Sequence, residues 1–206
     1  PLVADGKAVV TILHPDTEAG RRAAATVAAS IADRTGAAPA VRAAAEADRI
    51  PDGPAILLGN VDNNPAMLLL YARYMTPADS VCPGAGGALV HTICDPFGRG
   101  ANVVVAGATD DAGLNRAAEV LSGVIRRQDK AASLTLPRLF ERHYGESFLK
   151  RFAWADDEPA ANRLQRGLQD GQKALDEGRH CSVASVLSSV ANRYRFTSHS
   201  VEAELF

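Results

Sequence analysis

The stretch that decides the fold is ALVHTICDPFGRGANVVVAGATDDAGLNRAAEVLSGVIRR at residues 88–127. Residues 88–94 and 102–106 are short apolar runs rich in β-branched side chains, a composition typical of strands. The linker between them, 95–100, is short and made of turn residues. We therefore expect the two strands to pair as a hairpin.

A helix is expected directly after this hairpin. Asp110 and Asp111 stand at its start and Arg126 and Arg127 at its end, an arrangement that suits the helix dipole. Its apolar residues recur at helical spacing and form one stripe, which consists of Leu114, Ala117, Leu121, Val124 and Ile125.

The residues before the hairpin alternate between strand and helix patterns. They predict a strand at 7–13, a helix at 17–34 with Asp16 as its cap, a weak strand at 40–42, a strand at 55–58, a helix from 63 to about 75 and a loop at 76–87. Residues 134–136 form a possible short strand. The pattern indicates an α/β (α+β) domain with a small mixed sheet flanked by helices.

The pattern changes after about residue 140, where strand signals stop. Residues 159–177 and 181–195 are amphipathic and predict two helices joined at Gly178 and Arg179. We therefore divide the chain into an α/β domain at 1–139 and an α-helical extension at 140–206. Two antiparallel helices cannot bury both apolar stripes alone, so the extension is expected to be the start of a further helical module.

Composition excludes several classes of protein. Hydrophobic residues make up 47% of the chain, enough to bury a core, while aromatic residues make up only 5%. The formal net charge of −2 gives no electrostatic footprint for nucleic acid. No apolar run approaches the roughly 20 residues that cross a bilayer, so neither nucleic acid nor a membrane is an expected partner.

The ends and the cysteines leave questions open. The chain begins at Pro1, and residues 202–206 stop in an apolar-periodic stretch without a helix stop signal, so we expect further polypeptide at both ends. Cys82, Cys94 and Cys181 lack the close pairing of zinc sites. A bridge between Cys82 and Cys94 and two buried thiols are both compatible with the sequence.

No motif assembles a catalytic, metal or cofactor site. The glycines of residues 84–87 precede a strand and lack the lysine of a phosphate-binding loop. The five histidines are scattered, and no nucleophile elbow occurs. The acidic pairs at 110–111 and 156–157 are adjacent in sequence, so their carboxylates point apart and fit helix starts or linkers better than glycoside hydrolysis.

Two polar turns and one strand histidine are the candidate binding residues. The turn at 59–64 contributes Asn60, Asp62, Asn63 and Asn64, and the turn at 95–99 contributes Asp95 and Arg99. Such side chains form hydrogen bonds with sugar hydroxyls or with a neighbouring domain, although turn chemistry alone also explains them. His91 is expected on a sheet face, either lining a pocket or half-buried.

The arrangement in residues 88–127 resembles the small domain that precedes the barrel in bacterial β-hexosaminidases and α-glucuronidases. The resemblance rests on the hairpin, the small-residue turn at 107–111 and the helix with Gly113, Ala117 and Leu121. The elements within 7–58 are similar to the opening of that domain. In those families the domain is non-catalytic and packs against the catalytic domain, and the resemblance implies a secreted or periplasmic protein.

The extension at 140–206 departs from that pattern, because it looks helical rather than like the first strand of a barrel. By analogy alone, this favours a helical catalytic module such as that of heparinase-like polysaccharide lyases. The leading hypothesis is thus a non-catalytic accessory domain of a larger bacterial carbohydrate-active protein. Its expected partners are the remainder of the parent polypeptide and carbohydrate.

Two alternatives come from other classes. The first is a stand-alone small-molecule or protein-binding α/β module that uses the loops at 59–64 and 84–99. The second is an enzyme with an unfamiliar site around His91 and Asp95.

Overall fold

The computed structural model describes residues 1–44, 50–150, 166, 169–170, 172–173 and 176–177. The chain divides into two compact units, Pro1–Phe148 and Leu149–Phe206. In the second unit, the described residues from 166 to 176 have helical backbone conformation, within the first helix expected there. The helix expected at 181–195, together with Cys181 and the acidic pair at 156–157, lies outside the described residues.

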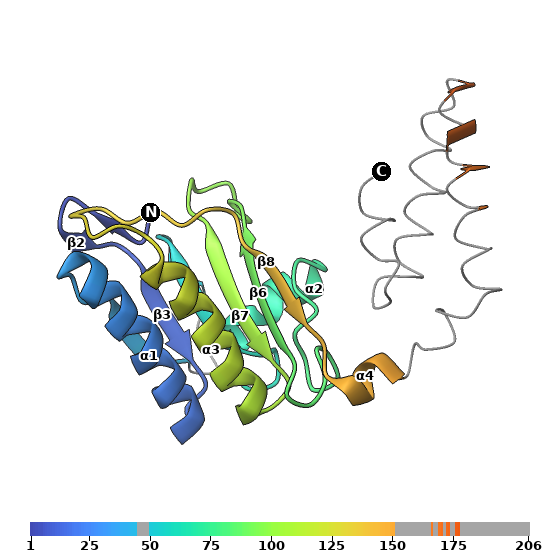
Figure 1. Ribbon diagram of the computed structural model, residues 1–206, viewed down its shortest axis with the longest axis horizontal. Coiled ribbons are helices and arrows are strands. Elements are labelled where there is room, and N and C mark those ends of the chain that lie inside the picture. The colour runs from blue at the N-terminus through green and yellow to red at the C-terminus, as the bar shows by residue number, and fades with distance from the viewer. Residues whose placement is uncertain (45–49, 151–165, 167–168, 171, 174–175, 178–206) are drawn as a thin grey trace. The chain divides into compact units, whose positions relative to one another are not determined.

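A six-stranded mixed sheet forms the centre of the first unit, in the order β4–β3–β5–β7–β6–β8 (Figure 1). Its strands are β3 (Thr11–His14), β4 (Ala40–Ala43), β5 (Ala55–Gly59), β6 (Ala88–Ile93), β7 (Val103–Ala108) and β8 (Phe140–His143). The strands β4, β3, β5 and β7 are parallel, and β6 runs antiparallel to both β7 and β8. A separate two-stranded sheet pairs β1 (Val3–Ala4) with β2 (Lys7–Ala8).

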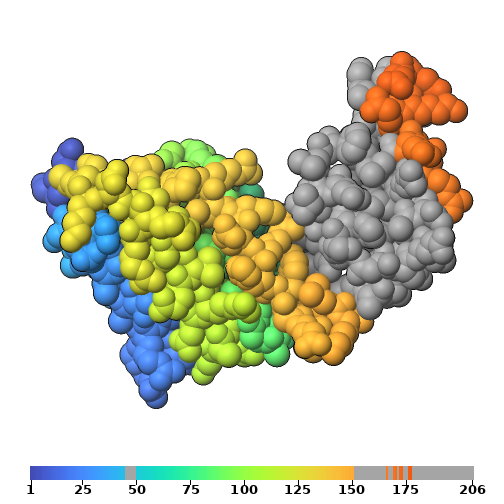
Figure 2. Space-filling view, in the orientation of Figure 1, coloured from blue at the N-terminus to red at the C-terminus, as the bar shows by residue number. Residues whose placement is uncertain are grey.

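Two helices, α1 (Glu18–Thr35) and α3 (Asp111–Arg126), cover one face of this sheet. Figure 2 shows them side by side on the near face, α1 in blue and α3 in yellow-green. Alanines on the buried side of α1 let it lie close to the sheet. We call the apolar layer between these helices and the sheet the first core; it contains Ile56 and Leu58 of β5.

The opposite face carries much less helix. A 3-10 turn, η1 (Pro65–Met67), leads into the short helix α2 (Leu68–Ala72). Met67 and Leu70 pack there against Leu57 of β5, in what we call the second core. Side chains along β5 thus alternate between the two cores, as the two-residue period of a strand requires. A further short helix, α4, spans Glu146–Lys150.

The structure confirms the predicted fold class, an α+β domain with a mixed sheet and flanking helices. The expected hairpin is the antiparallel pair β6–β7, which places Ala88 opposite Ala108. The predicted strands at 40–42 and 55–58 are β4 and β5, and the helix expected at 110–127 is α3. No disulfide joins the two described cysteines: Cys82 is buried and Cys94 exposed.

Four details of the sequence analysis were wrong. Strand signals do not stop at 140, because β8 pairs with β6 at the edge of the sheet. The cap of α1 is Thr17, whose side chain accepts a hydrogen bond from the backbone N–H of Gly20, while Asp16 pairs with Arg21. The helix expected from 63 to 75 is only η1 and α2, and the possible strand at 134–136 is a single bridge between Leu134 and Val3.

In the described part of the chain, no helix combines the length and apolar composition needed to cross a bilayer.

The start of α3 depends on Asp110. Its carboxylate accepts hydrogen bonds from the backbone N–H groups of Gly113 (2.8 Å) and Gly86 (3.0 Å), so it caps the helix and holds the glycine-rich loop. Gly113 must lack a side chain, because a Cβ there would lie 2.1 Å from the carbonyl oxygen of Gly87. Within the loop itself, Gly87 also packs against backbone, since a Cβ there would lie 2.6 Å from the carbonyl oxygen of Pro83.

We predict that Asp110→Ala lowers the free energy of unfolding by about 2 kcal/mol, because it removes a helix cap and a charge-assisted bond. The matched control is Asp111→Ala on the next, exposed residue, which should cost about 0.5 kcal/mol or less. Urea denaturation of both variants measures the difference, and equal losses would contradict the assigned role.

Candidate functional site

The two polar turns expected to bind ligand lie at opposite ends of the strands. The turn at 59–64 follows β5, at the carboxyl ends of the parallel strands. The turn at 95–99 joins the end of β6 to the start of β7, at the amino ends of the parallel strands. They therefore cannot form one site.

Side chains of the first turn are engaged by the backbone. Asn60 Nδ2 donates to the carbonyl oxygen of Ala108 at the end of β7 (2.8 Å), and its Oδ1 accepts from the backbone N–H of Asp62 (3.0 Å). Asn63 Oδ1 accepts in turn from the backbone N–H of Asn60 (2.8 Å). Of the four candidates in this turn, only Asp62 and Asn63 are exposed.

Asn64 makes the deepest of these contacts. It is fully buried, and its Nδ2 donates to the carbonyl oxygens of Leu58 (2.8 Å) and Leu13 (3.2 Å). One amide thus joins the ends of β5 and β3, while Asn60 joins the same loop to β7. The turn thus covers the carboxyl ends of the strands, where α/β domains commonly bind ligands.

A second set of bonds, which the sequence analysis missed, holds the loop between α2 and β6. Asp79 Oδ1 accepts from the backbone N–H groups of Val81 and Cys82, both at 2.7 Å. Asp79 Oδ2 accepts from the hydroxyl of Tyr71 (2.7 Å). This hydrogen bond and the nearby negative charge raise the pKa of Tyr71 above its ordinary value of 10.0. The signal in the sequence is an Asp two residues before the N–H that it accepts from, which is an Asx turn.

His91 and Asp95 do not form a common site. His91 faces the second core side of the sheet, half-buried, and its Nε2 lies 3.2 Å from the carbonyl oxygen of Met75. Asp95 adopts a positive φ of 38° and its Oδ1 accepts from the backbone N–H of Arg99 (2.6 Å). Asp95 thereby shapes the turn.

An open hollow of about 680 Å³ lies on the second core side of the sheet. Its described lining consists of Arg42, Ile50, Pro51, Asp52, Leu69, Phe97 and Arg99. The Arg99 guanidinium pairs with the Asp52 carboxylate at the rim. Of the seven residues proposed from the sequence, only Arg99 lines this hollow.

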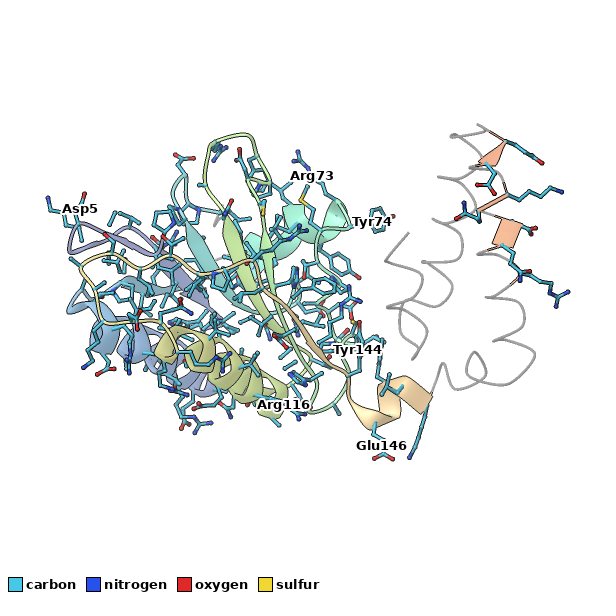
Figure 3. All side chains as sticks on the ribbon, turned by 45° about the horizontal axis from the view of Figure 1, so that its top comes forward. Asp5, Arg73, Tyr74, Arg116, Tyr144 and Glu146 are labelled. Atoms are coloured by element: carbon cyan, nitrogen blue, oxygen red, sulfur yellow. The ribbon has the colours of Figure 1, made fainter. Side chains whose placement is uncertain are left out.

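Phe97 is one of the residues that line the hollow. It packs half-buried against the second core. The guanidinium carbon of Arg73, just after α2, lies 5.5 Å from the centre of its ring, and that of Arg99 lies 5.7 Å from it. In Figure 3 the labelled Arg73 and Tyr74 stand together at the end of α2. An aromatic residue inside a turn of Asp, Pro, Gly and Arg was the signal available in the sequence.

Among the described residues, no three His, Cys, Asp or Glu side chains gather as metal ligands would. Comparison with known proteins assigns no relative: no protein-family model matches the chain, and no curated protein matches it significantly.

We predict that Asn64→Ala lowers the free energy of unfolding by roughly 2–4 kcal/mol, since it strips two buried carbonyl groups of a donor and leaves a void. Asp62→Ala, in the same turn but exposed, should change stability by about 0.5 kcal/mol or less. Thermal and urea unfolding of the two variants provide the comparison. A large loss in Asp62→Ala instead would mean that the wrong side chain has been assigned the structural role.

The raised pKa of Tyr71 makes a prediction at alkaline pH. Folding favours the neutral phenol, so its contribution to stability is complete below the ordinary pKa of 10.0 and is lost as the pH rises through the raised pKa of the folded protein. Absorbance titration at 295 nm should show a late phase that disappears in Tyr71→Phe. A late phase that survives Tyr71→Phe would refute the assignment.

Proposed function

We propose that this chain is a non-catalytic accessory domain of a larger bacterial carbohydrate-active protein and packs against a catalytic module. The observation that carries the proposal is the hydrogen bonding of the polar side chains at the carboxyl ends of the parallel strands. Asn60, Asn64 and Asp110 all lie there, and all three bind backbone groups. The residues best placed for chemistry are thus used to close loops.

The arrangement within residues 88–127 supports the same proposal. The hairpin β6–β7, the turn after β7 and helix α3 follow one another as in the small domain that precedes the catalytic barrel in bacterial β-hexosaminidases and α-glucuronidases. That domain is non-catalytic in those families. Such a role requires a surface for another module, because the domain acts through what it contacts.

Exposed apolar side chains at α2 supply a candidate for that surface. Leu68 is 58% exposed and Tyr74 is 86% exposed, and both lie on the side of the sheet opposite α1 and α3. Large apolar side chains that gather on a surface commonly mark a contact with another protein. We assign this contact to the catalytic module of the parent polypeptide.

The hollow around Phe97 favours the alternative of a stand-alone module that binds a small molecule, because a concave surface that combines apolar side chains with charged ones is a common form of ligand site. The open reading frame separates the two proposals. A catalytic module encoded after Phe206 supports the accessory role, whereas a stop codon there supports the stand-alone module.

Activity measurements test the accessory role directly. The 206-residue chain should turn over neither a panel of polysaccharides nor aryl glycosides, because Asp79, Asp95 and Asp110 all bind backbone groups of loops. Robust turnover of any member of the panel would overturn the proposal.

A charge placed on the proposed contact surface gives a sharper prediction. Tyr74→Asp should leave the melting temperature of the 206-residue chain nearly unchanged, since the side chain is exposed there, and should lower that of the parent polypeptide by several degrees. The control is Ala112→Asp on the exposed first turn of α3, where an acid suits the helix dipole. Equal behaviour of the two variants in the parent would remove α2 from the contact.

A further inference from the structure

We propose that the hollow around Phe97 binds the acidic group of an anionic saccharide, either a carboxylate or a sulfate ester. The inference rests on the proposed function for the saccharide and on the geometry of the hollow for the acid. Its lining combines the apolar side chains of Ile50, Pro51 and Leu69 with the guanidinium of Arg99. A sugar ring has apolar C–H faces and polar edges, so it matches such a lining.

Phe97 holds the two arginines in position. Its ring is fixed by packing against the second core, and the cations of Arg73 and Arg99 both lie within 6 Å of its centre, the range of a cation–π contact. The contact places both guanidinium groups at one ring. A guanidinium presents parallel N–H donors that match the two oxygens of a carboxylate or sulfate.

The charges around the hollow favour an anion. Two guanidinium groups, those of Arg73 and Arg99, lie at the Phe97 ring, whereas Asp52 is the one acid in the described lining. The surrounding chain is slightly acidic, with a net charge of −2, so the positive charge here is local. A local site suits one acidic group on a sugar better than the long phosphate backbone of a nucleic acid.

Asp52 marks where the ligand acid would bind. Its carboxylate pairs with Arg99 at the rim, but its side chain is 91% exposed and that of Arg99 is 51% exposed. Ion pairs this exposed to water are weak. A ligand that also packs on Phe97 and Leu69 therefore has more contacts than Asp52 and displaces it from Arg99, so Asp52 acts as an internal competitor.

The experiment is a calorimetric titration of the 206-residue chain with four ligands. They are oligogalacturonate, which carries carboxylates, a heparin-derived oligosaccharide, which carries sulfates, a neutral cello-oligosaccharide and inorganic sulfate. We expect at least one acidic saccharide to bind, with affinity that falls as salt is added, and neither the neutral saccharide nor sulfate alone to bind comparably. The first two arms show which acid the hollow prefers.

Variants locate the site. Arg99→Ala and Phe97→Ala should each weaken binding about tenfold or more, as expected for loss of a charge-assisted bond or of the ring that positions it. Arg73→Ala should weaken binding less. Arg126→Ala is the matched arginine control and should not change affinity, because Arg126 lies on α3, on the opposite face of the sheet, and pairs there with Glu119.

Asp52→Asn is the decisive variant, because it removes the internal competitor and should raise the affinity for the acidic saccharide several-fold. Circular dichroism and melting temperatures confirm that each variant is folded; if Phe97→Ala fails to fold, Arg99→Ala and Asp52→Asn decide the question. Weaker binding in Asp52→Asn, an unchanged affinity in Arg99→Ala, equal binding of the neutral saccharide or of sulfate alone, or no binding of either acidic saccharide overturns the inference. None of these results bears on whether a catalytic module follows Phe206, so the accessory role stands or falls separately.

Discussion

The pairing of β5 with β7 is the constraint on which the rest of the structure depends. Every residue of both strands is buried, so both faces of the sheet must be covered along this pair. On one face, α1 and α3 do so with 18 and 16 residues. On the other face, η1 and α2 have only three and five residues. This unequal cover accounts for the hollow around Phe97 and for the exposed apolar residues of α2.

The polar residues at the strand ends follow from the same constraint. Parallel strands must each be followed by a loop, and a loop that crosses buried strand ends brings backbone groups that need partners. Asn60 and Asn64 supply these partners to β7, β5 and β3. In this domain, Asn60 and Asn64 at the usual place of an active site form hydrogen bonds that hold the loop onto the strand ends.

The sequence predicts those parts of the fold that depend on neighbouring residues. The hairpin β6–β7 and helix α3 were predictable because strand, turn and cap signals follow one another within residues 88–127. The edge strand β8 was not predictable, because it pairs with only one other strand and its sequence has no apolar run. Its residues are Phe140, Glu141, Arg142 and His143. The end of α2 was not either: Tyr74 takes a positive φ of 58°, a backbone conformation that no local residue type announced.

The candidate site was harder to predict for a geometric reason. Arg42, Asp52, Arg73 and Phe97 come from four separate segments, and only the packing of α2 and the β6–β7 turn on the sheet brings them together. From sequence, Arg99 stood out because it lies in a polar turn, but its partner Asp52 is 47 residues away. Asn64 was proposed as a binding residue for the same reason, because turn residues and ligand-binding residues share a composition. In the structure it is buried.

The two outer strands of the sheet have a consequence for solubility. An outer strand offers unpaired backbone groups to any other chain, and repeated pairing of this kind leads to fibrils. Here β4 carries Arg42, and β8 carries Glu141, Arg142 and His143 within four residues. A strand from another molecule that paired with β4 or β8 would have to take these charged side chains out of water, and this cost disfavours growth of the sheet into aggregates.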